Sequence, residues 1–151
     1  MLVAQTQQIC TFSVGGRLFG IDVTRVQEVI RHQEMTRVPL APESIQGLIN
    51  LRGQIVTAID MRARLGVEPR VSGELALNVV VRSNDGPVSL LVDEIGDVVI
   101  VDRSSFEPLP ETLNASSRQL LIGVYKLPGQ LLLLLDPQRA AEPSEHSTQG
   151  S

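Results

Sequence analysis

The hydrophobic and polar positions of this chain alternate in short runs that indicate β-strands separated by tight turns. Residues 9–14 and 17–22, "ICTFSV" and "RLFGID", are β-prone runs on either side of a glycine pair, which predicts a hairpin. Two aliphatic runs flank "SNDGP", residues 83–87, in the same way. Residues 53–60, "GQIVTAID", indicate a further strand. This pattern is typical of a mainly β protein.

Three segments carry helical signals instead. The apolar positions of 23–30, "VTRVQEVI", recur at helical spacing and predict one or two turns. A helix is also expected to begin at Pro42, and Gly47 predicts that it is short. Residues 61–66, "MRARLG", predict one further turn. A few short helices are therefore expected between the strands.

The run Leu131–Leu135 consists of leucine alone. A strand of this composition has no polar face, so we expect both of its faces to be buried. The run is far shorter than the roughly 20 apolar residues that a membrane-spanning helix needs. It therefore predicts a core strand and not a membrane segment.

The two halves of the chain resemble each other. "GQIVTAIDMRARL" from Gly53 and "GQLLLLLDPQRAA" from Gly129 share their Gly, Gln and Asp, and "LFGIDVTRVQEV" and "SLLVDEIGDVV" each place an aspartate after a hydrophobic run. Two similar β-rich halves suggest paired small barrels, since closure removes exposed sheet edges. We expect one domain over 8–138 with a polar link near 66–75, and a disordered tail over 139–151.

Composition narrows the choice of partners. The 13 basic and 17 acidic residues give a net charge of -4, which offers no electrostatic footprint for nucleic acid or anionic lipid. Aromatic residues make up 3% of the chain, so the core must be aliphatic. A single cysteine, Cys10, and the lack of a secretory signal fit a reducing, cytoplasmic setting.

The residues that carry chemistry do not form a familiar catalytic pattern. No phosphate-binding loop and no Cys/His cluster with metal-ligand spacing is present, so we expect no cofactor and no metal. Cys10 is interpreted as a packing residue, and His32 as solvated. The carboxylate pairs, Asp93 with Glu94 and Asp85 near Asp97, are interpreted as belonging to solvated turns. An interaction module is favoured over an enzyme, although catalysis by Cys10 or a carboxylate pair stays open as an alternative.

Four segments together resemble the CheW-type chemotaxis coupling proteins, over about 9–136. They are "FSVGGRLFGIDVTRVQEVI", "TRVPLAPESIQGLINLRGQIVTAIDMRARLG", "SLLVDEIGDVVIVD" and "LIGVYKLPGQLLLLLD". The resemblance implies two five-stranded SH3-like β-barrels with a shared core. It also implies a non-catalytic adaptor that couples the cytoplasmic tips of chemoreceptors to the regulatory domain of a CheA-type histidine autokinase. Such an adaptor is cytoplasmic, is recruited to membrane-associated receptor arrays, and binds no nucleic acid and does not insert into the membrane.

The resemblance also implies a binding site. The arginine of "NLRG", Arg52, would lie near a receptor-binding groove and form an ion pair with Glu111, which follows the Pro-x-Pro segment. The alternative is that Arg52 caps carbonyl groups at the end of 44–51. A receptor tip is a helical hairpin, so the groove should be apolar with a polar rim. The expected receptor-binding residues are Val26, Glu28, Val29, Gln46, Arg52, Ile95 and Val98.

Two matters stay open at this level. No short motif marks the kinase-binding residues. An adaptor of the same fold that serves another chemosensory pathway, such as pilus motility or development, would carry the same motifs.

Overall fold

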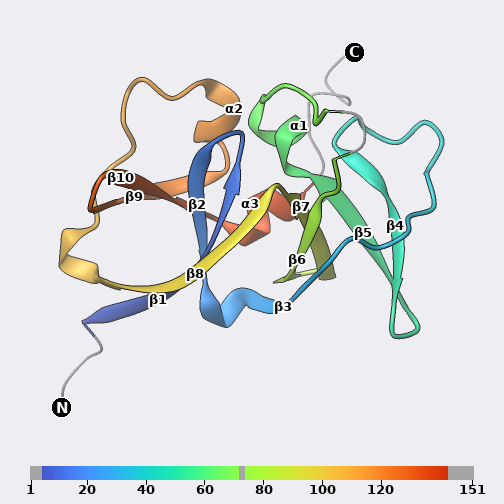
Figure 1. The fold of residues 1–151 in the computed structure, drawn as a ribbon, viewed down its shortest axis with the longest axis horizontal. Helices are drawn as coiled ribbons and strands as arrows, with labels where there is room; N and C mark the ends of the chain where they lie inside the picture. Colours follow the sequence, from blue (N-terminus) through green and yellow to red (C-terminus); the bar gives the residue numbers. More distant parts are fainter. Residues whose placement is uncertain (1–4, 72–73, 143–151) are drawn as a thin grey trace.

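The computed structural model describes residues 5–71 and 74–142 and contains two five-stranded sheets (Figure 1). The first sheet has the order β8-β1-β2-β10-β9 and the second the order β3-β6-β7-β5-β4. The strands of the first half are β1 (Thr6–Val14), β2 (Arg17–Asp22), β3 (Val26–Ile30), β4 (Ile45–Leu51) and β5 (Gln54–Asp60). Those of the second half are β6 (Leu77–Ser83), β7 (Gly86–Val92), β8 (Glu94–Asp102), β9 (Leu121–Leu127) and β10 (Gln130–Leu135). The expected mainly β fold with two five-stranded units is confirmed.

The two halves exchange strands. Each sheet combines the first two strands of one half with the last three strands of the other, and the junctions are the parallel pairs β2–β10 and β7–β5. Strand β5 therefore occupies the same position in the second sheet as β10 does in the first. The sequence similarity between the segments that begin at Gly53 and Gly129 reflects this equivalence.

The outer edges of each sheet approach each other at one point. Thr36, in the segment after β3, exchanges two backbone hydrogen bonds with Leu48 of β4, at 2.9 and 2.8 Å. Glu107, in the segment after β8, exchanges an equivalent pair with Val124 of β9, at 2.9 and 2.8 Å. Each sheet is thus curled like an SH3-type barrel, but its edges meet at an isolated bridge and not along a continuous ladder.

A glycine precedes the bridging residue of each sheet. A Cβ atom on Gly47 would lie 2.8 Å from the carbonyl oxygen of Thr36, and one on Gly123 would lie 2.7 Å from that of Glu107. A side chain at either position would therefore prevent the returning chain from reaching the sheet edge. The motifs "QGL" and "IGV" owe their glycines to this close approach.

The leucine run of β10 supplies two different cores. Leu132 and Leu134 pack inside the curl of the first sheet, whereas Leu133 and Leu135 belong to the large core between the two sheets. A third, smaller core lies within the second sheet. The prediction that both faces of this strand are buried is confirmed for these four leucines, while Leu131 at the start of the strand is 40% exposed.

The helices are short and lie between strands. They are α1 (Met61–Leu65), α2 (Ala115–Arg118) and α3 (Pro137–Ala141), with the 3₁₀ turns η1 (Val23–Arg25) and η2 (Arg103–Ser105). The aspartate that the two halves share is an N-cap in both: the side chain of Asp60 accepts from the backbone N–H of Arg62, and that of Asp136 from Gln138. The predicted helical turn over 61–66 is confirmed, and Gly66 ends it in the left-handed conformation.

Two helical predictions are wrong. Residues 26–30 form the edge strand β3, and only Val23–Arg25 make a helical turn. Residues 45–51 form β4 instead of a helix beginning at Pro42. In both segments pairing with a neighbouring strand, β6 for β3 and β5 for β4, outweighs the local apolar spacing.

The ordered chain continues past the expected domain end at residue 138. Helix α3 reaches Ala141, and both Ala140 and Ala141 are buried. The predicted disorder is therefore wrong for 139–141, and 143–151 lie outside the described residues. The expected link near 66–75 is a loop in its described part, and residues 72–73 are likewise outside it.

Candidate functional site

Arg52 lies at the tip of the β4–β5 hairpin, not inside an apolar segment. Arg52 and Gly53 both have positive φ, 55° and 86°, as a two-residue turn of the primed type requires. The side chain of Asn50 accepts a hydrogen bond from the backbone N–H of Gly53 at 2.9 Å and supports this turn. The Arg52 side chain is 74% exposed, so its charge carries no burial cost.

The exposed guanidinium of Arg52 pairs with Glu28 of β3. Its Nη1 atom donates to Glu28 Oε2 at 2.5 Å, and the Glu28 side chain is only 16% exposed. Strands β3 and β4 are the two outer edges of the second sheet. The ion pair therefore crosses the opening between these edges, on the same sheet as the Thr36–Leu48 bridge, and joins two of the predicted receptor-binding residues.

The predicted ion pair between Arg52 and Glu111 is not formed among the described residues. Arg52 belongs to the hairpin tip of the second sheet, whereas exposed Glu111 lies in the loop before α2, beside the first sheet. Figure 1 shows that this hairpin and this loop lie at opposite ends of the molecule. The short separation between Glu28 and Arg52 across the sheet opening explains why the arginine takes that partner instead.

The predicted apolar residues lie on the edge strands of both sheets. Val29 of β3 is 43% exposed, and Ile95 and Val98 of β8 are 38% and 53% exposed. Val26 instead packs partly against the core between the sheets. Gln46 is exposed on β4. Among the predicted receptor-binding residues, the structure therefore shows a side-chain ion pair between Glu28 and Arg52. The other predicted residues lie on the edge strands β3, β4 and β8.

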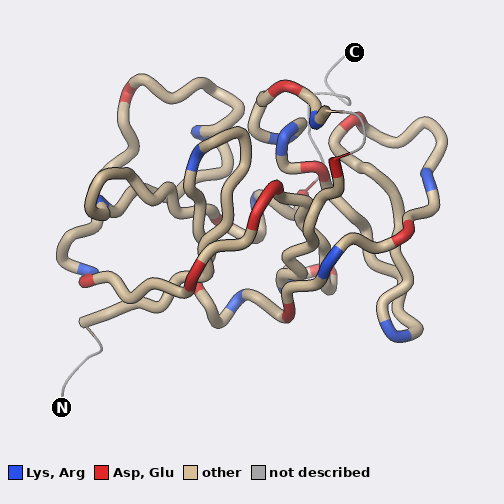
Figure 2. The backbone as a smooth tube through the Cα atoms, viewed as in Figure 1, with Lys and Arg blue, Asp and Glu red and all other residues tan. Residues whose placement is uncertain are grey.

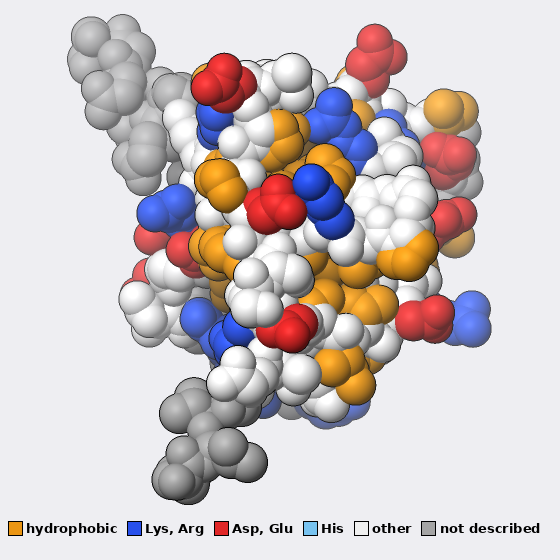
Figure 3. Space-filling model, turned by 90° about the vertical axis from the view of Figure 1, so that its left-hand side faces the viewer, with side chains coloured by type: hydrophobic (Ala, Val, Ile, Leu, Met, Phe, Trp, Pro, Cys, Tyr) orange, Lys and Arg blue, Asp and Glu red, His pale blue; other side chains and the backbone are white. Residues whose placement is uncertain are grey.

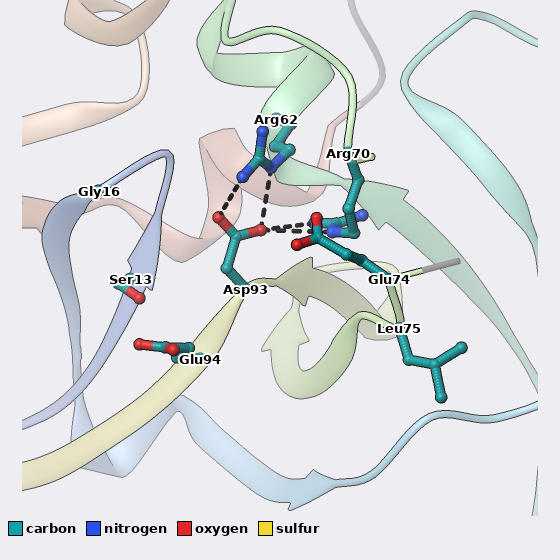
Figure 4. Close-up of a pocket in the computed structure, with 8 residues that line it drawn as sticks. All are labelled: Ser13, Gly16, Arg62, Arg70, Glu74, Leu75, Asp93 and Glu94. Carbon is teal, nitrogen blue, oxygen red and sulfur yellow. Dashed lines mark hydrogen bonds and ion pairs between the residues drawn. The ribbon is translucent and has the colours of Figure 1, made fainter. Parts of the chain in front are cut away.

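Asp93 is the charged residue that the sequence interpretation missed. Its carboxylate accepts two hydrogen bonds from Arg62, at 3.0 and 2.8 Å, and two from Arg70, from Nε at 3.3 Å and from Nη2 at 3.0 Å. The backbone N–H of Gly15 donates to the same carboxylate at 2.8 Å. Figure 4 shows the two arginines converging on Asp93 beside a cavity of about 440 Å³, which Ser13 and Glu74 also line.

The interpretation of Asp93 as part of a solvated turn is therefore wrong. The side chains of Arg62, Arg70 and Asp93 are 19%, 14% and 19% exposed. The arginines are 31 and 23 residues away from Asp93 along the chain, so no local pattern links them. The signal in the sequence was the position of Asp93 directly after the apolar run 90–92, where an acidic side chain needs partners.

The surroundings of Asp93 determine its protonation. Partial burial would raise the pKa of the Asp93 carboxyl group, but the hydrogen bonds from Arg62, Gly15 and Arg70 outweigh it and lower the pKa to about 2. The hydrogen bond to Asp93 in turn raises the pKa of Arg62. Asp93 and Arg62 therefore face each other as a carboxylate and a guanidinium ion near neutral pH.

The described residues do not assemble an evident reaction centre. Burial and the nearby Asp22 raise the pKa of the Cys10 thiol, which disfavours the reactive thiolate. Within 5–71 and 74–142, no group of three or more His, Cys, Asp or Glu side chains is arranged to hold a metal ion. No helix in these ranges is both long and apolar enough to cross a membrane.

Charged and apolar side chains are interspersed over the surface (Figure 2, Figure 3). Figure 2 shows basic and acidic positions interspersed along the described chain. Figure 3, which faces the side of the first sheet, shows hydrophobic side chains between charged ones. The exposed apolar residues of that sheet and its loops include Ile100, Phe106, Ile122 and Leu131. This surface is separate from the Glu28–Arg52 pair and carries no assigned partner.

Comparison with known proteins identifies the family. Residues 8–144 match the model of the CheW-like domain. The chain is 32% identical to the chemotaxis protein CheW of Bacillus subtilis, with 86% of this chain and 83% of that protein covered. It is 26% identical to Protein PilI of Pseudomonas aeruginosa, with 76% of this chain and 64% of that protein covered.

A solved structure agrees with this result. The scaffolding protein TtCheW of Thermoanaerobacter tengcongensis superimposes with a TM-score of 0.78 at 29% sequence identity, over 87% of this chain and 90% of that one. The motifs, the two strand-exchanged sheets and the matches all point to the same assignment. The chain therefore belongs to the CheW-like family of chemotaxis coupling proteins.

Proposed function

We propose that this chain is a non-catalytic adaptor that joins the cytoplasmic tips of chemoreceptors to the regulatory domain of a CheA-type histidine kinase. Membership of a family of chemotaxis and scaffolding proteins supports this role. The observation that carries the receptor-binding part is the Glu28–Arg52 pair at the open edge of the second sheet. Exposed Val29 follows Glu28 on the same edge strand.

The exposed side chains of the second-sheet edge and of β8 on the first sheet suit a helical partner. A receptor hairpin presents a helix with an apolar stripe and polar flanks, which docks against exposed apolar positions bordered by charges. Val29, Ile95 and Val98 supply exposed apolar positions, and Glu28, Gln46 and Arg52 supply the polar border. In this proposal the polar border sets the register of the helix, and the apolar positions contribute most of the affinity.

Arg52 has a conformation that suits a role in binding. A non-glycine residue at φ 55° costs on the order of 1 kcal/mol or more in backbone strain. Glycine would avoid this cost, whereas the exposed pair with Glu28 returns less than about 1 kcal/mol. The fold alone therefore gains little from an arginine here, which supports a function for its side chain at the surface.

A binding measurement tests the proposal. Titration calorimetry would use a soluble receptor cytoplasmic fragment and a separate kinase regulatory domain, each with wild type, Arg52→Glu and Lys126→Glu. Lys126 is the matched control, because it is a 69% exposed cation that pairs with Glu107 on the first sheet. We expect Arg52→Glu to weaken receptor binding by at least about tenfold, and Lys126→Glu to leave it unchanged. Equal receptor affinity for wild type and Arg52→Glu would remove Arg52 from the site.

Recruitment to receptor arrays follows from the same proposal. A fluorescent fusion of the chain should form membrane-associated clusters in cells that contain receptors and kinase. The Arg52→Glu fusion should remain diffuse at equal abundance. Clusters of equal intensity for both fusions would contradict recruitment through this site.

A second candidate is an adaptor for a pilus-linked chemosensory pathway, which the similarity to Protein PilI supports. The fold and the proposed binding edge would be the same, and only the partners would differ. Parallel titrations with the regulatory domains of a flagellar and a pilus-linked kinase would separate the two candidates. Tighter binding to the pilus-linked domain would favour the second.

A further inference from the structure

Asp93 is the one residue between β7 and β8, where the chain passes from the second sheet to the first. Strand β7 ends at Val92 in the second sheet, and β8 begins at Glu94 in the first. The backbone N–H of Asp93 donates to the carbonyl of Ser13 at 2.9 Å, which fixes the crossover to β1. By contrast, the crossover from β2 to β3 contains the three-residue turn η1. The relative orientation of β7 and β8 is therefore set over one residue.

The donors to the Asp93 carboxylate come from parts that belong to different sheets. Gly15 is in the β1–β2 turn of the first sheet, and Arg62 is on α1, which directly follows β5 of the second sheet. Arg70 is in the loop that connects the two halves of the chain. Its Nη1 atom also lies 3.7 Å from Oδ1 of Asp60, the N-cap residue of α1. Figure 4 shows Arg62 and Arg70 reaching the carboxylate from separate segments. The carboxylate therefore ties both sheets and the connecting loop together.

This arrangement is rigid for physical reasons. The guanidinium of Arg62 donates through both Nε and Nη2, which fixes the plane of the carboxylate. Arg62 is itself held, since its Nη1 donates to the carbonyl of Glu68 at 2.9 Å. The low exposure of the three side chains limits screening by water. A carboxylate with donors on several sides cannot shift toward one of them without weakening its bonds to the others.

The residues that follow Asp93 belong to the proposed receptor site. Ile95 is two residues after Asp93 and Val98 five residues after it, both exposed on β8. The Glu28–Arg52 pair and Val29 are on the second sheet. A helix that contacts both β8 and the second sheet requires a fixed separation between them.

We propose that Asp93, held by Arg62 and Arg70, is a positioning residue that sets the separation of β8 from the second sheet and thereby the affinity for the receptor hairpin. The receptor part rests on the proposed function. Asp93 immediately precedes β8, and it is not expected to contact the receptor itself. Its effect on binding passes through the position of the strand.

The test combines a distance measurement with a binding measurement. Spin labels would be attached to Ile100→Cys on β8 and Ile55→Cys on β5, both exposed, in a Cys10→Ser background. The distance distribution would be recorded for this protein and for its Asp93→Asn version, which keeps the size of the side chain and removes its charge. Asp85→Asn is the matched control, because Asp85 is exposed in the β6–β7 turn and takes part in none of the ion pairs of the described residues.

We expect Asp93→Asn to broaden or shift the distance distribution and to lower receptor affinity on the order of tenfold, with Asp85→Asn unchanged in both. Arg62→Ala should have the same effects, and the Arg62→Ala/Asp93→Asn double variant should lose little more than either single variant, because both remove the same contact. An unchanged distribution and affinity in folded Asp93→Asn would overturn the proposal.

A second variant keeps the test decisive if Asp93→Asn does not fold. Arg70→Gln removes one of the two arginines and leaves the Arg62 pair in place, and it should change both readouts in the same direction by a smaller factor. A wild-type distribution and affinity in Arg70→Gln would then overturn the proposal. Failure of the wild type to bind the receptor fragment would contradict the proposed function alone, since the distance measurement needs no receptor.

Discussion

Glu28 and Arg52 form an ion pair that spans the two open edges of a single sheet. The pair joins β3 to the tip of the β4–β5 hairpin, although β3 and β4 are the outermost strands of the sheet order. The pair can form only because the sheet curls and brings its two outermost strands close together. Since Glu28 is largely buried and Arg52 largely exposed, the pair fixes the direction in which the hairpin tip presents its arginine.

Exchange of the two charges tests whether the pair itself matters for binding. Glu28→Arg and Arg52→Glu should each weaken receptor binding, because each places like charges next to each other. The double variant Glu28→Arg/Arg52→Glu should regain part of the lost affinity if the pair orients the hairpin, and titration calorimetry would measure it. If the double variant binds as weakly as the sum of the single losses predicts, then each charge acts on the receptor independently.

Replacement of Arg52 by glycine should separate stability from binding. Relief of the strain at φ 55° and loss of an exposed ion pair oppose each other, so the free energy of unfolding should change by no more than about 1 kcal/mol. Receptor affinity should nevertheless fall, because the positive charge is gone. Urea denaturation and calorimetry on the same sample would check both quantities. A loss of stability above about 2 kcal/mol would show that Arg52 has a structural role that the exposed pair does not explain.

The Asp93 cluster should make stability depend on acidity. The pKa of Asp93 is about 2 in the folded protein, which is below its value of 3.8 in the absence of partners. The folded state therefore binds this proton less readily than the unfolded state, and the stabilisation is fully present above about pH 4. It is lost as the pH falls from about 4 to about 2, and it amounts to no more than about 2 kcal/mol because the group is partly solvated.

Urea denaturation at pH 5 and pH 2.5 would measure this contribution. The wild type should lose more stability between the two values than Asp93→Asn, which has no carboxyl group to titrate at this position. Asp85→Asn should behave like the wild type. The same pH dependence in wild type and Asp93→Asn would assign the acid sensitivity to other carboxylates.

Leu40 is in an unfavourable conformation at the surface. Its φ is 64° and its side chain is completely exposed, so it has backbone strain and gains nothing from burial. Leu40→Asn should raise the free energy of unfolding by about 0.5–1 kcal/mol, because asparagine tolerates the left-handed region better. Val38→Asn, at a partly exposed residue without a positive φ, is the control and should not be stabilising. Thermal denaturation of both variants would decide between these outcomes.

The local sequence pattern was sufficient to predict an element wherever that element depends on its own residues alone. The Gly15–Gly16 turn and the leucines of β10 were predictable, because turn chemistry and burial of both faces are local properties. Segments 26–30 and 45–51 were not, since their strand form depends on pairing with β6 and β5. The family resemblance placed Glu28 and Arg52 in one binding region. That Arg52 pairs with Glu28 and not with Glu111 could not be predicted, because it depends on the curl of the sheet.

The charge cluster shows the same limit for the site. Asp93 was interpreted as part of a solvated turn, because its partners Arg62 and Arg70 come from a helix and a loop that only the fold brings close. Contacts between residues this far apart in the sequence follow no hydrophobic period and no sequence motif. They can be identified only when the positions of α1, the connecting loop and the β7–β8 junction are known.

The exchange of strands between the halves also determines how this protein must fold. Since each sheet needs strands from both halves, residues 8–70 alone would leave β1 and β2 without β8, β9 and β10. Neither half can complete a core by itself, so folding should be one cooperative transition dominated by contacts distant in sequence, and correspondingly slow. Two fragments cut within the connecting loop should be unfolded separately and should recover the native sheets only when mixed.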